Sequence, residues 1–304
     1  MNEFKPESKA GFVAVMGRPN VGKSSVINAL LGQKVAAVSP RPQTTRKRQL
    51  GIISIDEKDR TVQVIFVDTP GIHNPMHKLG EKMNQEARDI LEDSDLILLV
   101  VDASQPPNDE DQLLFELLGK LHRNIPVILA LNKTDLISDE ELTSKRDIFI
   151  QRIPSAVDVP ISATENINIQ KLLDKIINHL PDGYPFYPQD QITDLYEREI
   201  AADLIREASL KILREEVPHG VAVRIDQFTE RGETGAYIEA TLFVERESHK
   251  PIVVGKGGKM IKEIGSAARK EIEAMSGRKV YLRLNVKVRK DWRNDEKILR
   301  RFGY

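Results

Sequence analysis

Cysteine is absent from the 304 residues, and so is any long apolar run. Without cysteine the chain has no disulfide framework, no thiolate metal site and no cysteine nucleophile. The longest apolar run, LILLVV at 96–101, is far shorter than the roughly 18 residues that a membrane-spanning helix needs. The first residues, MNEFKPESKAGF, lack the apolar core of a secretory signal. We therefore expect a cytoplasmic protein without a transmembrane segment.

Charge is nearly balanced over the whole chain, with a net charge of −1, but it is unevenly distributed. Residues 250–304 contain 16 Lys and Arg against 6 Asp and Glu, whereas residues 1–249 contain 29 against 40. Such a basic segment on an acidic body is typical of a module that binds a polyanion, although an ordinary solvated surface is the alternative. With 304 residues, 40% of them hydrophobic, the chain is long enough for two domains.

Short apolar runs alternate with amphipathic segments over the first 180 residues. The pattern predicts strands at 12–17, 61–69, 96–103, 126–133 and 159–163. It predicts helices at 23–31, 76–92, 109–122, 139–152 and 166–180. Alternation of this kind indicates an α/β domain over 1–180, with a mainly parallel sheet and helices on both faces. Three prolines and a glycine within 180–194 predict a linker, placed at 181–193.

Residues 194–304 have a different element order. A helix at 194–216 is followed by two alternating strands, VAVRIDQF and AYIEATLFVE. A short helical segment at 248–254, a helix at 259–276 and the strand KVYLRLNVKV follow. This order predicts a small α+β domain with a half-exposed antiparallel sheet and a basic C-terminal tail. In that tail we expect Trp292 to be a core residue.

The segment GRPNVGKSS at 17–25 stands between the first expected strand and the first expected helix. It satisfies G-x-x-x-x-G-K-[ST] in the context that this phosphate-binding motif requires. Its two glycines let the backbone wrap a phosphate, Lys23 reaches the β- and γ-phosphates, and Ser24 ligates Mg²⁺. The expected phosphate-binding residues are Gly17, Arg18, Pro19, Asn20, Val21, Gly22, Lys23, Ser24 and Ser25.

The tetrapeptide NKTD at 132–135 follows a buried strand and indicates that the base is guanine. The Asp135 carboxylate can accept two hydrogen bonds from guanine N1–H and its amino group, which adenine cannot donate there. Asn132 can bond the outer edge of the base, and the stem of Lys133 can stack on its face. Ser162 and Ala163, after the last expected strand, supply a backbone amide for guanine O6.

Two further segments complete a nucleotide switch. DTPG at 68–71 ends a strand, so that Asp68 can hold Mg²⁺ through water and the Gly71 amide can sense the γ-phosphate. In PQTTR at 42–46, we favour Thr45 over Thr44 as the residue that closes over Mg²⁺. The expected Mg²⁺ ligands are Ser24, Thr45 and Asp68. The expected switch residues are Thr44, Thr45, Asp68, Thr69, Pro70, Gly71 and Ile72.

These four motifs together resemble the translation-factor-like GTPases, and GRPNVGKSS with DTPG resembles their bacterial branch that includes tRNA-modifying GTPases. The resemblance implies GTP or GDP with Mg²⁺ as ligands. Ile72 stands where Ras-like proteins carry the glutamine that orients the attacking water, so unassisted turnover should be slow, on the order of 10⁻⁴ to 10⁻² per second. In relatives, an asparagine at the position of Asn20 helps to bind K⁺; a loop-stabilising side chain is the alternative.

The segment VVGKGGKMI at 253–261 is also glycine-rich, but it lacks the rest of a nucleotide site. GKGG at 255–258 fits G-x-x-G between two helical segments, the loop with which KH domains clamp about four nucleotides. A plain glycine turn is the alternative. We expect RNA contacts from Ile252, Val254, Gly255, Lys256, Gly257, Gly258, Lys259, Lys262, Arg289 and Arg293.

A GTPase domain, a short linker and a C-terminal type II KH domain, with GKGG followed by KEIG and AR, resemble the Era family over essentially the whole chain. The resemblance implies binding of 16S ribosomal RNA near its 3′ end and a role in assembly of the small ribosomal subunit. It also implies peripheral association with the inner face of the membrane, and we expect a monomer. Two other functions are open: an RNA-binding scaffold that holds GTP without useful turnover, and a tRNA-modifying GTPase, against which the missing cysteine argues.

Overall fold

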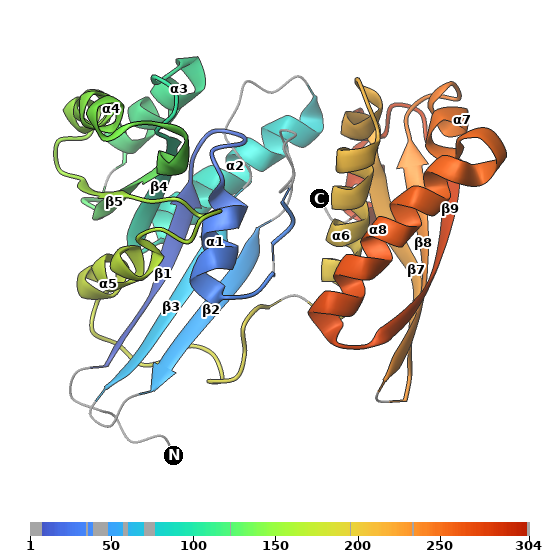
Figure 1. The fold of residues 1–304 in the computed structure, drawn as a ribbon, viewed down its shortest axis with the longest axis horizontal. Helices are drawn as coiled ribbons and strands as arrows, with labels where there is room; N and C mark the ends of the chain where they lie inside the picture. Colours follow the sequence, from blue (N-terminus) through green and yellow to red (C-terminus); the bar gives the residue numbers. More distant parts are fainter. Residues whose placement is uncertain are drawn as a thin grey trace. The chain divides into compact units, whose positions relative to one another are not determined.

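A computed structural model of the chain describes residues 8–34, 36–38, 48–56, 60–69, 77–121, 123–194, 196–232 and 234–302. The chain divides into two compact units, one containing the first sheet and reaching Asp194, the other containing the second sheet. Figure 1 shows the elements of each unit. In the described part of the chain, no helix is both long and apolar enough to cross a membrane.

In the described residues, the first unit contains a six-stranded sheet in the order β2-β3-β1-β4-β5-β6. Only the β2–β3 pair is antiparallel, so the expected mainly parallel sheet is confirmed. Its strands are β1 (Lys9–Met16), β2 (Gln49–Asp56), β3 (Thr61–Asp68), β4 (Leu96–Asp102), β5 (Val127–Asn132) and β6 (Val157–Pro160). Its helices are α1 (Lys23–Leu31), α2 (Lys78–Asp93), α3 (Asp109–Gly119), α4 (Asp139–Arg152) and α5 (Ile169–His179).

Helices cover both faces of this sheet (Figure 1). One hydrophobic cluster joins the sheet to α1 and α5, and the other joins it to α2, α3 and α4. All seven residues of β4 are buried, as expected for a central strand covered on both sides. Parallel strands end at the same edge, so the ends of β1, β3, β4 and β5 bring the predicted motifs together.

The sequence pattern does not predict strand β2; it predicts only a polar loop between the first helix and the strand at 61–69. β2 is an edge strand with one neighbour, and Gly51 lowers its strand propensity. A Cβ atom at Gly51 would lie 2.9 Å from Leu31 Cδ1 and 3.1 Å from Ile27 Cγ2. Glycine therefore lets α1 pack closely over β2, and tertiary contact rather than local propensity fixes this strand.

The segment 181–193, predicted as a linker, lies against the first unit. The Gly183 amide donates to Ser8 O at 3.0 Å, and the Ile52 amide donates to Ile192 O at 2.8 Å. The buried Gln63 side chain accepts from the amides of Phe186 and Tyr187 and donates to Tyr187 O at 2.9 Å. These bonds pair several backbone groups of a proline-containing segment that forms neither a helix nor a strand in the sheet.

In the second unit, strands β7 (Ala222–Arg231), β8 (Gly235–Val244) and β9 (Lys279–Val288) form a sheet in that order. Its helices are α6 (Glu197–Ile212), α7 (His249–Val254), α8 (Lys259–Ser276) and α9 (Glu296–Arg301). The expectation of an antiparallel sheet is wrong for β9, which pairs parallel to β8. A helical crossover through α7 and α8 carries the chain back before β9 begins, and such a crossover joins parallel strands. Helices α6 and α8 pack on one face of the sheet.

Candidate nucleotide-binding and RNA-binding sites

The loop between β1 and α1 is wound tightly enough that only glycine fits at two positions. Gly22 has a φ of 100°, and a Cβ atom there would lie 2.4 Å from Asn132 Nδ2. A Cβ atom at Gly17 would lie 2.4 Å from Val100 O. The loop is thereby packed against the ends of β4 and β5, and the first turn of α1 begins directly after it. This is the geometry of a phosphate cradle at a helix N-terminus.

Lys23 lies inside this loop with its ammonium group directed at the loop backbone. Its Nζ donates to Gly17 O at 3.0 Å and to Arg18 O at 3.1 Å. Burial lowers the pKa of Lys23 to about 8, although the nearby Asp68 carboxylate favours the charged form. A buried ammonium group held by neutral carbonyls is incompletely compensated, and a phosphate would supply the missing negative charge.

Ser24 and Asp68, two of the three expected Mg²⁺ ligands, lie in contact. The Ser24 hydroxyl donates to Asp68 Oδ2 at 2.8 Å, and Asp68 is buried at the end of β3. A hydroxyl and a carboxylate are hard oxygen donors, and both fit a Mg²⁺ ion. Thr69 is also buried, but its hydroxyl donates a hydrogen bond to Val15 O of β1 at 2.7 Å, so the side chain has a structural role. The other expected switch residues, Thr44, Thr45, Pro70, Gly71 and Ile72, lie outside the described residues.

Asn132 fastens the phosphate loop to the loop that follows β6. Its Nδ2 donates to Val21 O at 2.8 Å, and its Oδ1 accepts from the Ala163 amide at 3.0 Å. The two groups expected to contact the base edge and guanine O6 are thus bonded to each other. The neighbouring Ser162 is fully buried, and its hydroxyl accepts from the Glu165 amide at 3.2 Å.

The residues expected to bind the base follow β5 directly. Lys133 has a left-handed backbone with a φ of 68°, which turns the chain into the short helix at Thr134–Leu136. The Thr134 amide and hydroxyl both bond Ile161 O, so this helix is fixed to the end of β6. Asp135 is exposed within it. The structure therefore brings Asn132, Lys133, Asp135 and the loop after β6 to one edge of the sheet, beside the phosphate loop.

The GKGG loop between α7 and α8 depends on glycine for its shape. Gly255, Gly257 and Gly258 have φ values of 73°, 61° and 77°. A Cβ atom at Gly255 would lie 2.7 Å from both the amide nitrogen and Cβ of Met260. The three predicted lysines, Lys256, Lys259 and Lys262, are exposed, as is Ile252, while Val254 is half-buried. The loop can therefore approach a phosphate backbone closely while its lysines supply positive charge.

A family model described as 50S ribosome-binding GTPase matches residues 12–133, and a KH-domain model matches residues 216–293. The GTPase Era of Heliobacterium modesticaldum (strain ATCC 51547 / Ice1) is 46% identical over 296 residues, which cover 97% of each chain. The chain belongs to the Era family.

Two solved structures of Era match both units of this chain. Era in complex with MgGDPNP and nucleotides 1506-1542 of 16S ribosomal RNA is 40% identical, with a TM-score of 0.91, and the match covers 98% of this chain and 99% of that one. A single-substitution variant of Aquifex aeolicus Era, bound to GDP.AlF4-, is also 40% identical, with a TM-score of 0.90 and coverage of 97% and 99%. The fold class inferred from the sequence, a P-loop GTPase domain followed by a KH domain, is confirmed.

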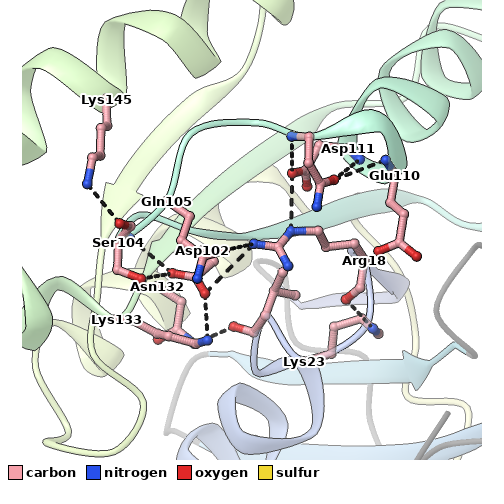
Figure 2. A network of polar contacts seen from close by, with 12 residues as sticks. Arg18, Lys23, Asp102, Ser104, Gln105, Glu110, Asp111, Asn132, Lys133 and Lys145 are labelled. Carbon is pink, nitrogen blue, oxygen red and sulfur yellow. Dashed lines mark hydrogen bonds and ion pairs between the residues drawn. The ribbon is translucent and has the colours of Figure 1, made fainter. Parts of the chain in front are cut away.

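One part of this Era-family nucleotide site was missed by sequence reasoning. Asp102 is the last residue of β4. Its Oδ2 lies 2.6 Å from the Nζ of Lys133 and 3.8 Å from the Nη2 of Arg18 (Figure 2). Burial acts to raise the pKa of Asp102, but hydrogen bonds from Lys133 and Ser104 outweigh it and the pKa is lowered. Asp102 therefore stays ionised and links the phosphate loop to the segment that is expected to bind the base.

The Arg18 side chain is anchored to α3 and to the loop before it. Its Nε lies 3.2 Å from Asp111 Oδ2, and its Nη2 donates to Gln105 Oε1 at 3.2 Å. Burial raises the pKa of Asp111. The signal that could have revealed Asp102 is its place at the end of a buried strand, at the edge where Gly17 and Asn132 were expected.

The other loop residues differ in burial: Val21 is fully buried, Asn20 is exposed, and Pro19 and Ser25 are half-buried.

Two tail residues of this Era-family chain have structural roles. Arg293, predicted as an RNA contact, is ion-paired with Glu245 and only 21% exposed, so it is not a free cation for RNA. Arg289, by contrast, is exposed. Trp292 is fully buried and donates from Nε1 to Gly220 O at 2.9 Å, which confirms its expected core position.

Proposed function

We propose that this protein is a GTP-hydrolysing switch that binds 16S ribosomal RNA near its 3′ end and assists assembly of the small ribosomal subunit. The observation that carries the proposal is the match, over 98% of the chain, to Era in complex with MgGDPNP and nucleotides 1506-1542 of 16S ribosomal RNA. The chain's own residues agree with both ligands. Lys23, Ser24 and Asp68 suit a magnesium nucleotide, and the GKGG loop suits an RNA backbone.

Each group has a distinct task in the proposed reaction. The amides of the phosphate loop and the Lys23 ammonium hold the β- and γ-phosphates, while Ser24 and Asp68 hold Mg²⁺. When bound, Mg²⁺ neutralises charge that develops on the transferred phosphoryl group. Asp135 selects guanine. Ile72 cannot orient water by hydrogen bonding, so we propose slow intrinsic hydrolysis that is assisted by K⁺ at Asn20 or by the RNA partner.

Phosphate release during single turnover tests the switch against a scaffold with inert GTP. We expect hydrolysis that is faster in K⁺ than in Na⁺ and that changes when RNA containing the 16S 3′ region is added. No release above the uncatalysed rate under any of these conditions would favour the scaffold. Equal rates in the two salts would remove the role of K⁺ at Asn20 while leaving the switch intact.

We further propose that the protein acts as a cytoplasmic monomer that associates peripherally with the inner face of the membrane. Cell fractionation followed by a high-salt wash of the membranes tests the location, because a peripherally attached protein is released by the wash. Sedimentation of the purified chain tests the oligomeric state. A dimer, or a membrane fraction that resists the wash, would contradict this proposal.

A further inference from the structure

The face of the second sheet that points away from α6 and α8 carries two stacked tyrosines. Tyr237 of β8 and Tyr281 of β9 are partners in the parallel register. Their ring centroids lie 5.6 Å apart and the rings are inclined by only 10°. Tyr281 is 65% exposed. One face of each ring lies against the other tyrosine, and Arg231 lies over the Tyr237 ring, so the exposed aromatic surface of the pair is mainly that of Tyr281.

Neither ring is part of the core of the second unit. The core side of β8 is formed by the alternating residues Ala236, Ile238, Ala240, Leu242 and Val244. Tyr237 lies between the first two of these and therefore points to the opposite face. A stacked pair at this position contributes about 0.5–1.5 kcal/mol to the sheet at most, and smaller cross-strand pairs would hold the register equally well. Folding alone gives little reason to expose so large a ring surface.

Cations outnumber carboxylates on the sheet face that carries the tyrosines. The Arg231 guanidinium lies 5.1 Å from the Tyr237 ring centroid, and Arg283 follows Tyr281 by two residues on the same face. By strand register, the outer face contains the cations Arg224, Arg231, Lys279, Arg283 and Lys287 and the carboxylate Glu239, and Asp226 joins them through its bond from the outer-face residue Thr241. Arg224 is ion-paired with Asp226 and Arg283 lies 3.8 Å from Glu239, which leaves an excess of three positive charges. Aromatic rings beside arginines, in an excess of positive charge, are the features with which proteins bind unpaired nucleic-acid bases.

This surface is remote from the GKGG loop within the same unit. The loop directly precedes the first residue of α8, whereas Tyr281 lies five residues after the last. Eighteen residues of α-helix span about 27 Å, and the tyrosines lie on the sheet face that α8 does not cover. The roughly four nucleotides that a G-x-x-G loop clamps cannot also reach the tyrosines.

We propose that the outer face of this sheet, centred on Tyr237 and Tyr281 and bordered by Arg231 and Arg283, binds unpaired RNA bases as a second RNA contact. This inference depends on the proposed function only in that RNA is taken as the partner. Charge complementarity favours RNA over a protein partner, because a polyanion matches the excess of cations and every base offers a flat face for stacking.

The test compares two single-stranded RNAs with sequences from the 3′ end of 16S ribosomal RNA on the full chain: one of about five nucleotides, which the GKGG loop alone can fill, and one of about 20 nucleotides. The variants are Tyr281→Ala, Tyr281→Phe and, as a control, Tyr184→Ala, which removes an exposed tyrosine of the first unit. We expect Tyr281→Ala to weaken binding of the long RNA about tenfold and to leave the short RNA unaffected. Tyr281→Phe keeps the ring and should bind nearly as the unaltered protein does.

Photo-crosslinking of the long RNA with 4-thiouridine provides a second readout, with adducts expected on the peptides that contain Tyr237 and Tyr281. Equal affinities of Tyr281→Ala and Tyr184→Ala for the long RNA, with adducts confined to the GKGG region, would overturn the second contact and leave the proposed function standing. If the unaltered protein binds neither RNA, the proposed function fails and this inference fails with it. Thermal unfolding of each variant shows whether a loss of affinity is due to misfolding. If it is, the adduct positions on the unaltered protein decide whether the second contact exists.

Discussion

The ammonium group of Lys133 lies 2.6 Å from Asp102 Oδ2, so the segment expected to bind the base is ion-paired with the last residue of the central strand β4. The same carboxylate oxygen faces Arg18 of the phosphate loop at 3.8 Å. One buried carboxylate therefore connects the two halves of the nucleotide site. Because Lys133 is held at its tip, its alkyl stem is fixed where the base is expected to stack.

Replacing Asp102 with Asn should weaken nucleotide binding. The change leaves Lys133 and Arg18 without their shared countercharge, and the loss of one partner of a buried pair costs about 3 kcal/mol or more. We expect a nucleotide off-rate raised about tenfold or more, measured by displacement of a fluorescent GDP analogue. Asp158→Asn is the matched control, since it breaks the Arg146–Asp158 ion pair between α4 and β6. An Asp102→Asn off-rate no faster than that of the control would contradict the linking role.

Base selectivity should depend on one exposed carboxylate. Asp135→Asn replaces an acceptor with a donor, so guanine loses a bond and xanthine, which presents an oxygen there, gains one. We expect GTP affinity to fall by about 10² or more while xanthosine triphosphate binds better than GTP. Competition binding of the two nucleotides measures the ratio. Asp139→Asn, an exposed change in the first turn of α4, should leave the ratio unaltered. Retained preference for guanine in Asp135→Asn would refute the assignment.

Nucleotide affinity should decline at alkaline pH because of Lys23. Its pKa in the folded protein is about 8, below the ordinary 10.5, whereas bound phosphates require the charged form. Affinity should therefore be constant below about pH 8 and should fall by up to tenfold per pH unit above it. Titration calorimetry between pH 7 and 9 measures this decline. Lys23→Met should bind weakly with no such slope, and a slope that persists in that variant would assign the titration to another group.

The same shift has the opposite consequence for the nucleotide-free fold. Between pH 8 and 10.5 the unfolded state binds more protons at Lys23 than the folded state does, so stability rises with pH in that window. The stability gained in this window is fully present above pH 10.5 and is lost as the pH falls through about 8. At neutral pH the buried charge costs on the order of 3 kcal/mol, which Lys23→Met should relieve in urea denaturation without nucleotide.

Local sequence predicts the motifs of this protein better than it predicts their surroundings. Gly22, Lys23 and Ser24 can be assigned because a phosphate loop is a continuous segment with fixed spacing. The α1 and α8 boundaries follow from helical periodicity and from the glycines beside them. The Asp102–Lys133 pair joins residues 31 positions apart and becomes visible only when β4 and β5 are known to be neighbours.

Long-range contacts also explain the other differences. Gln63 is a polar residue in the middle of a buried strand, and local pattern gives it no role. In the folded chain, its side chain accepts hydrogen bonds from the amides of Phe186 and Tyr187, which are far away in the sequence. Likewise, the alternation in β9 correctly predicts which residues face the core, but it carries no information on strand direction, which the preceding helical crossover determines.

Two arginines of the tail should behave differently, because Arg293 is ion-paired with Glu245 whereas Arg289 is exposed. Arg293→Ala should lower the free energy of unfolding by about 1–3 kcal/mol, since it leaves a carboxylate that is 11% exposed without its partner. Arg289→Ala should change stability by less than about 0.5 kcal/mol. It should instead reduce the slope of log affinity for RNA against log salt by about 0.7, the value for one phosphate contact. Urea denaturation and RNA binding at several salt concentrations measure the two effects separately. A reduced salt slope with unchanged stability in Arg293→Ala would show that this arginine leaves Glu245 to contact RNA, as the sequence alone predicts.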